Sequence, residues 1–266
     1  MKFGYGTACA VLLLAAAAIP GFAGGSGDLA ESRSSLGAIR KAGVLKVGVK
    51  SDVPKFGFLN TTTNKYEGLE IELAKLIAKD IFGNADKIAF VPVTAKTRGS
   101  LLDTDEVDLI IATFTITEER KLIYNFSTGY YTDAVGMMVK KASDITGLQS
   151  CDGKIIGVGQ SATSRKAIHD AAGKLGVNIA FIEFATYPET KAALNSGRVD
   201  VFSVDKSILN GYCGADDIIL PDAFSPQEYG IAAKLGNKAL AKHVDNLIQK
   251  WLKDGTIEAL VKKLEL

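Results

Sequence analysis

Hydrophobic residues change their spacing repeatedly along the chain, and the changes predict alternating strands and helices. The run LKVGV (Leu45–Val49) is typical of a short buried strand. In YEGLEIELAKLIAKDIFG (66–83), leucines and isoleucines recur at helical spacing, and Gly83 is a typical helix end. The following segments predict a strand, a short helix and a strand: residues 87–93, 97–105 and 107–114. Strands that alternate with helices predict a mostly parallel sheet covered by helices on both faces.

The second half of the chain repeats this alternation. In both halves a helix ends, a Val-Asp pair opens an apolar strand, and polar residues follow the strand; the pairs begin at Val107 and Val199. The predicted elements of the second half are, in order, strand, helix, strand, helix and strand: residues 154–159, 161–176, 179–185, 187–197 and 199–204. Two α/β lobes of similar build are therefore expected.

The expected bounds of the lobes follow from where the second alternation begins and ends. Lobe 1 comprises residues 36–139 together with 228–266, and lobe 2 comprises residues 140–227. Two connections between the lobes, near residues 139–141 and 224–229, would form a hinge.

The first residues, MKFGYGTACAVLLLAAAAIPGFA (1–23), have the composition of a secretory signal peptide. Lys2 precedes an uncharged apolar run, and the small residues Gly21 and Ala23 flank the expected cleavage point. Removal of this segment takes one of 31 cations and none of 30 anions, which leaves a neutral mature chain. A neutral chain has no electrostatic footprint for nucleic acid or an anionic membrane. We therefore expect a periplasmic protein without a nucleic-acid partner.

Polar side chains gather at the carboxyl ends of four predicted strands, where ligands bind in open α/β sheets. These side chains come from both lobes and are carried by four short motifs: Lys50-Ser51-Asp52, Thr113-x-Thr115-x-Thr117-x-x-Arg120, GQSATS at a helix start (159–164), and Asp205. A helix start and a guanidinium suit a carboxylate, and an acid on the opposite wall suits an ammonium group. The combination describes a site for a free α-amino acid.

Each motif also has a purely structural interpretation. The threonines favour strands, and Thr117 can cap a helix. Arg120 can pair with a neighbouring glutamate on a solvated face. The SATS stretch and Asp205 can each serve as a helix cap. The functional interpretation depends on the joint placement of these residues in two lobes.

Four motifs, in order, resemble the extracellular solute-binding proteins of polar amino-acid ABC transporters (family 3): YEGLEIELAKLIAKDI, ATFTITEERKLIYNFSTGYY, GKIIGVGQSATS and PQEYGIAAK. The resemblance implies a two-lobed periplasmic-binding-protein type II fold that closes on a free amino acid. It also implies a monomer that delivers this ligand to the membrane permease of an ABC transporter.

The resemblance assigns roles by position. Arg120 and Thr115 would hold the α-carboxylate, helped by the helix start at Thr163 and Ser164. Asp205 would bind the α-ammonium, and the main-chain carbonyl of Thr113 would help it.

The identity of the amino acid depends on two places where this chain departs from relatives that stack neutral or cationic ligands between aromatic rings. Lys50-Ser51-Asp52 stands at the first place and Thr97-Arg98 at the second. A ligand with two carboxylates would need such cationic partners, because an unpaired buried anion is costly. The pattern is similar to that of aspartate- and glutamate-binding members of the family, and glutamine is the alternative ligand. Arg98 could instead cover the lobe surface, Lys50 could extend to solvent, and Tyr187 could close over the ligand or only pack its loop.

The remaining candidate groups point to no enzyme and no cofactor. Cys151 and Cys213 could form a disulfide in an oxidising compartment or remain two thiols. The histidines lack metal-ligand spacing. An exported dehydratase acting on prephenate or arogenate is the enzymatic alternative, and it would need a general acid among Glu67, Glu118 and Asp133.

Overall fold

The computed structural model describes residues 1, 2, 4 and 35–266 of the chain. Apart from its positions 1, 2 and 4, the predicted signal peptide lies outside the described residues. The folded part begins with α1 (Leu36–Ala42). Among the helices that are described, none combines the length and the hydrophobicity that a membrane crossing requires.

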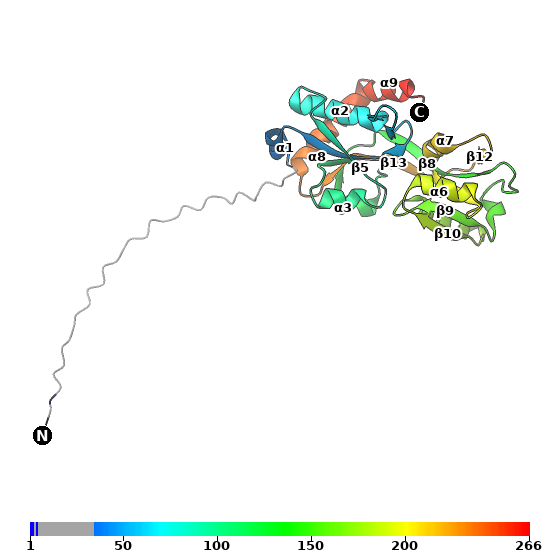
Figure 1. Ribbon diagram of the computed structural model, residues 1–266, viewed down its shortest axis with the longest axis horizontal. Helices are drawn as coiled ribbons and strands as arrows, with labels where there is room; N and C mark the ends of the chain where they lie inside the picture. Colours follow the sequence, from blue (N-terminus) through cyan, green and yellow to red (C-terminus); the bar gives the residue numbers. More distant parts are fainter. Residues whose placement is uncertain (3, 5–34) are drawn as a thin grey trace. The chain divides into compact units, whose positions relative to one another are not determined.

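The first sheet joins segments from the beginning, middle and end of the folded part. Its spatial order is β5 (Ile88–Pro92), β1 (Leu45–Val49), β6 (Leu109–Ile111), β14 (Ala232–Lys234) and β7 (Tyr124–Phe126). β1 is parallel to β5 and β6, whereas β14 is antiparallel to β6 and β7. The helices α2 (Leu69–Phe82), α3 (Arg98–Asp103) and α8 (Lys238–Lys253) surround this sheet (Figure 1). The last helix, α9 (Thr256–Lys263), packs on α2 and α8.

Helix α2 shows why this part of the chain folds as predicted. Its fully buried residues recur at helical spacing: Leu69, Glu70, Ile71, Leu73, Ala74, Ile77 and Ala78. Gly83 ends the helix in the left-handed conformation (φ 71°), which glycine adopts without steric cost. One buried residue, Glu70, is charged, and it proves important below.

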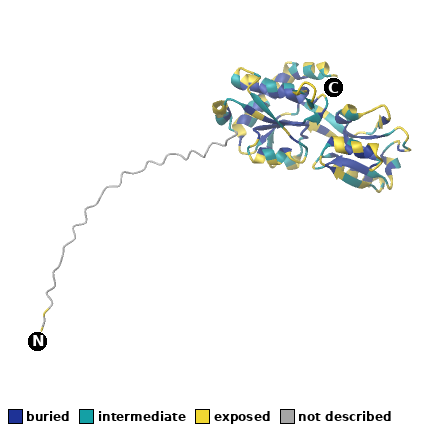
Figure 2. Ribbon diagram, in the orientation of Figure 1, coloured by how far each residue is buried: buried dark blue, intermediate teal, exposed yellow. Residues whose placement is uncertain are grey.

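The second sheet has the order β10 (Ala180–Phe184), β9 (Ile155–Gly159), β11 (Val201–Asp205), β8 (Tyr131–Lys140) and β12 (Asp217–Ile219). Its helices are α5 (Ser164–Leu175), α6 (Tyr187–Asn195) and α7 (Lys206–Tyr212), and η1 (Leu148–Cys151) precedes β9. The central strands of both sheets are largely buried, the edge strands β5 and β10 are only partly buried, and the outer faces of the helices are exposed (Figure 2). The prediction of two α/β lobes is thus confirmed.

Two short pieces complete the fold and both lie near the predicted site residues. A small antiparallel sheet, β2 (Asp52–Val53), β3 (Gly57–Asn60) and β4 (Lys65–Glu67), follows β1. The single-turn helix α4 (Glu118–Lys121) follows β6, and Thr117 caps it as expected by accepting a hydrogen bond from the Arg120 amide (3.2 Å).

The strands β8 and β13 (Phe224–Tyr229) pair with each other where the chain passes between the sheets. Tyr131 lies opposite Tyr229, and the Tyr130 amide donates to the Tyr229 carbonyl (2.9 Å). β8 also pairs with β11 and β12 along its further length. The second predicted connection, near residues 224–229, thus pairs with the first half of β8, and the lobe bounds remain a prediction.

The two cysteines do not form the disulfide that was one of the two alternatives. Both are free thiols, Cys151 buried and Cys213 exposed. Cys151 packs in the core of the second lobe, where burial raises the pKa of its thiol to about 11. Cys213 ends α7, where its sulfur lies 3.9 Å from the Asp217 carbonyl oxygen. The two thiols thus lie in different surroundings, one in the core and one at the exposed end of α7. Packing and ion pairs stabilise the second lobe.

A cluster of ion pairs centres on the buried Asp217, which begins β12 at the edge of the second sheet. Its carboxylate accepts hydrogen bonds from Lys191 Nζ (2.6 Å), Lys140 Nζ (2.9 Å) and the Gly214 amide (2.7 Å). Burial alone would raise the pKa of Asp217, but these three donors lower it to about 2. Because the pKa in the folded state lies below its ordinary value, the stabilisation is present above about pH 4 and is lost as the pH falls towards 2.

We predict that Asp217→Asn lowers the free energy of unfolding by about 3 kcal/mol at neutral pH, because two lysines lose their buried partner. The matched control is Asp144→Asn, since the Asp144 side chain is 85% exposed and lies 3.5 Å from Lys154. This control should cost less than about 0.5 kcal/mol. Urea unfolding measures both values, and equal losses would contradict the assignment.

Candidate ligand-binding site

The polar residues predicted at the strand ends come together from both lobes. Lys50 follows β1 and lies with its Nζ 4.6 Å from the centre of the Tyr187 ring, which belongs to α6. Arg120 of α4 donates through Nη2 to the carbonyl of Ser161, which precedes α5 (3.2 Å). The walls of the predicted site are therefore in contact across the space between the two sheets.

Arg120 is held by main-chain oxygens. Its Nη1 donates to the Thr115 carbonyl (2.7 Å), and its guanidinium lies 4.7 Å from the centre of the Phe114 ring. Glu118 pairs with Lys121 (2.8 Å), so the surface ion pair considered for Arg120 is not formed with it. Burial, and then the neighbouring Arg98, lower the pKa of Arg120 to about 9, which leaves it cationic at neutral pH.

Arg98 opens α3 and is 3% exposed, so the interpretation as a surface residue is wrong. Its Nη1 donates to the carbonyls of Ala112 (2.6 Å) and Thr113 (3.0 Å), and its guanidinium lies 4.0 Å from the centre of the Phe114 ring. Its Nε is buried without a hydrogen-bond partner in the described part of the chain. Two guanidiniums thus pack on one ring, and among the described residues neither forms an ion pair.

Lys50 does not extend to solvent, because only 1% of the residue is exposed. Its Nζ lies 3.1 Å from Asp52 Oδ1 and over the Tyr187 ring. Burial lowers the pKa of Lys50, and Asp52 partly opposes this shift. Tyr187 is itself 5% exposed and contacts Phe202 of β11, so it packs in its own lobe, and its closure over a ligand stays a prediction.

Asp205 ends β11 and is 5% exposed. Its side chain does not cap α7; instead, Asp133 Oδ2 accepts the Ser207 amide at the start of that helix (2.9 Å). Asp205 accepts a hydrogen bond from the Tyr229 hydroxyl. Burial raises the pKa of Asp205 to about 7, although Tyr229 and the guanidiniums of Arg98 and Arg120 favour its charged form. An ammonium group placed beside it would favour that charged form further.

The predicted hydroxyl groups divide into two kinds. Thr115 and Thr163 both donate to Gln227 Oε1, at 2.9 and 2.6 Å, and so connect β13 to the start of α5. Ser164 Oγ and Thr113 Oγ1 are buried without a partner among the described residues. The Thr163 side chain makes no capping bond, so the interpretation of SATS as a capping stretch is not supported. Thr115, Arg120, Thr163 and Gln227 also line a pocket of about 930 Å³.

Sequence reasoning missed four buried polar residues at this site: Glu70, Tyr130, Gln227 and Tyr229. Glu70 had a detectable signal, because a charged residue stood on the apolar face of the predicted helix 66–83. Gln227 and Tyr229 alternate along one strand, which places them on the same side of it. Tyr130 gave no comparable signal.

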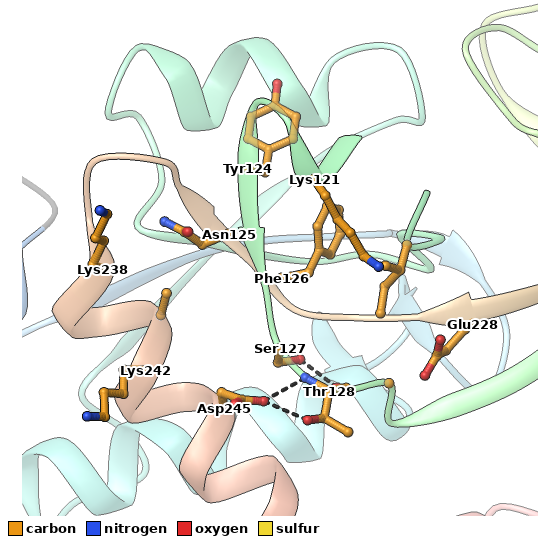
Figure 3. Close-up of a pocket in the computed structure, with 13 residues that line it drawn as sticks. Lys121, Tyr124, Asn125, Phe126, Ser127, Thr128, Glu228, Lys238, Lys242 and Asp245 are labelled. Carbon is orange, nitrogen blue, oxygen red and sulfur yellow. Dashed lines mark hydrogen bonds between the residues drawn. The ribbon is translucent and has the colours of Figure 1, made fainter. Parts of the chain in front are cut away.

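A second pocket, of about 620 Å³, lies in the first lobe beside β7 and the start of α8 (Figure 3). Lys238 and Lys242 of α8 lie along it, and Asp245 accepts hydrogen bonds from the amide (2.7 Å) and hydroxyl (2.8 Å) of Thr128. None of the residues predicted to bind the ligand lines this pocket.

Comparison with known proteins places this geometry in a family. The model of the bacterial extracellular solute-binding proteins, family 3, matches residues 45–264. The chain is 36% identical to the ABC transporter glutamine-binding protein GlnH of Bacillus subtilis, over 96% of this chain and 92% of that protein. Two solved structures are also similar to it. The cysteine-binding protein from Campylobacter jejuni has a TM-score of 0.76 and 29% identity, over 86% of this chain and 92% of that one.

The other is the ancestral amino acid-binding protein AncCDT-1, described as a precursor of cyclohexadienyl dehydratase. Its TM-score is 0.76 and its identity 29%, over 86% of this chain and 98% of that chain. These similarities confirm the prediction of a type II periplasmic-binding-protein fold.

We predict that the stability of the ligand-free protein falls by about 2 kcal/mol or more between about pH 5 and pH 8. Burial raises the pKa values of Glu70 and Asp205 to about 7, so the folded state binds more protons than the unfolded state in this window. Asp205→Asn should reduce the slope, whereas Asp216→Asn, at an exposed position, should not. Urea unfolding at several pH values measures the slope, and parallel curves for both variants would contradict the prediction.

Proposed function

The chain belongs to the bacterial extracellular solute-binding proteins, family 3, and we propose that it binds an acidic amino acid, aspartate or glutamate, for delivery to an ABC transporter permease. The observation that carries the proposal is the pair of neighbouring guanidiniums, Arg98 buried and Arg120 partly buried, which form no ion pair among the described residues. Asp205 on the opposite lobe supplies the acceptor for an ammonium group.

The ligand's two carboxylates match these two cations. Arg120, which contacts the Ser161 carbonyl shortly before the start of α5 and its partnerless Ser164 hydroxyl, suits the α-carboxylate. Arg98, with its free Nε, suits the second carboxylate and is flanked by the ammonium of Lys50. Since an uncompensated buried charge costs several kcal/mol, a dicarboxylate satisfies this wall better than a ligand with one carboxylate.

Glutamine is the second candidate, and two observations favour it. GlnH of Bacillus subtilis, a glutamine-binding protein, is a similar relative. In addition, Glu70 lies close enough to Arg98 to favour the charged form of the guanidinium, which reduces its need for an anionic ligand. The glutamine amide oxygen could accept from Arg98, although its NH₂ group would then face Lys50 with donors only.

Closure of the lobes would link binding to transport. The contact from Arg120 to Ser161 joins elements of opposite walls, and it can form only when these walls approach. A ligand held by Arg98 and Arg120 on one lobe and by Asp205 on the other favours that closed form by its differential affinity. The permease would recognise the closed, exported protein.

A dehydratase remains the enzymatic alternative because AncCDT-1 is described as a dehydratase precursor. The three acids expected for that role are poorly placed. Glu67 is exposed, the Glu118 side chain is 87% exposed, and Asp133 is engaged with the Ser207 and Ala134 amides. Incubation with prephenate and arogenate tests this alternative, since turnover without stoichiometric amino-acid binding would replace the proposed function.

We predict that the protein, freed of any co-purified ligand by unfolding and refolding, binds aspartate or glutamate stoichiometrically in calorimetry. A ligand that binds only the folded state raises the thermal midpoint, and the rise grows with its affinity. Among the twenty amino acids, an acidic one should therefore give the largest rise. Arg120→Ala should abolish binding of every amino acid. Glutamine as the tightest ligand would overturn the acidic preference and leave the binding function intact.

We predict that Arg98→Gln weakens glutamate binding by about 3 kcal/mol, roughly 100-fold, because the second carboxylate loses its buried partner. The loss for glutamine should be at least about tenfold smaller. Arg198→Gln is the matched control, since Arg198 is exposed on the second lobe. Equal losses of glutamate and glutamine binding would remove Arg98 from the selectivity role.

A further inference from the structure

Glu70 is a buried carboxylate to which the proposed binding mechanism gives no contact with the ligand. It lies in the first turn of α2, is 0% exposed, and is surrounded by fully buried apolar residues of the same helix. Burial raises its pKa to about 7, which shows that a charge at this position is costly. An apolar residue would fill the position at lower cost unless the carboxylate has a task.

The contacts of Glu70 identify that task. Its Oε1 accepts hydrogen bonds from the Tyr130 hydroxyl (2.6 Å) and from the main-chain amide of Thr113. The carbonyl of the same residue, Thr113, accepts from Arg98 Nη1 (3.0 Å). Thr113 is therefore held on both sides, its amide by a buried acid and its carbonyl by a buried cation.

The backbone of Thr113 needs such support. Its φ is 44°, in the left-handed region that β-branched residues avoid. A strained conformation of this kind persists only where the surroundings impose it, and it is found mainly at functional sites. Thr113 Oγ1 is also buried without a partner among the described residues, as is Arg98 Nε.

We propose that Glu70 is a positioning residue that holds Thr113 in its left-handed conformation and so sets the geometry of Thr113 and Arg98 towards the ligand. This inference rests on the proposed function only where it concerns affinity. The hold on Thr113 itself exists without any ligand.

The test compares Glu70→Leu, which fills the space without an acceptor, with Glu70→Gln, which keeps Oε1 as an acceptor. In ligand-free protein, amide hydrogen exchange at Thr113 should be about tenfold faster in Glu70→Leu and close to wild type in Glu70→Gln. The affinity for glutamate should fall about tenfold or more in Glu70→Leu and less than about threefold in Glu70→Gln. Glu72→Leu, on the same helix and half-exposed, should leave both quantities unchanged.

A role in packing alone predicts the opposite pattern, because leucine packs as well as glutamate. Wild-type exchange and affinity in Glu70→Leu would therefore overturn the proposal. If wild-type protein bound no amino acid, the proposed function would fail, while exchange at Thr113 would still decide the role of Glu70.

Thr113→Gly supplies a second variant that covers a failure to fold. Glycine adopts positive φ freely, so Glu70→Leu should cost less affinity in the Thr113→Gly background than in the wild-type background. If Glu70→Leu alone does not fold, the double variant should fold. If neither variant folds, the carboxylate is needed for the core around position 70 to pack and not for the conformation of Thr113. This result would overturn the proposal.

Discussion

The structure depends on keeping two neighbouring guanidinium groups charged, of which Arg98 is buried and Arg120 is partly buried. Arg98 and Arg120 pack on the same Phe114 ring and use main-chain carbonyls of residues 112, 113, 115 and 161 as hydrogen-bond acceptors. Carbonyl dipoles stabilise a cation only in part, so the wall keeps a preference for anions. The protein thus contributes partial charges, and in the proposed complex a carboxylate of the ligand would complete the compensation.

This requirement explains features of the fold that would otherwise be unfavourable. The segment after β6 must turn its carbonyls towards the arginines, and Thr113 adopts a positive φ in doing so. Glu70 then sits behind the turn as the acceptor of the Thr113 amide. Glu70, Thr113 and Arg98 therefore form one connected arrangement. Glu70 accepts from the amide of the strained Thr113, and the Thr113 carbonyl accepts from the buried Arg98.

Much of this could be predicted from sequence because it is local in the chain. The helical spacing of residues 66–83, the cap at Thr117 and the polar residues at strand ends are all visible over a few positions. Glu70 was not recognised, because its partners Thr113 and Tyr130 are 43 and 60 residues away. Gln227 was missed for the same reason, since it joins two threonines that belong to distant segments. The thiols show a related limit, because the spacing of two cysteines does not report which neighbours each one contacts.

Glu70 and Asp205, the two carboxyl groups whose pKa values are raised to about 7, affect folding and binding differently. Near neutral pH, Glu70 and Asp205 each lie between their charged and neutral forms, which limits the cost of burying them in the free protein. In the proposed complex, an ammonium group would favour the charged form of Asp205, and the ligand would supply part of the charge balance of the site. Glu70 faces Arg98, Lys50, Tyr130 and the Thr113 amide, all of which favour its charged form. Under the proposed function, a ligand would balance charges that the free site leaves uncompensated, and that difference in free energy would favour closure of the lobes on the ligand.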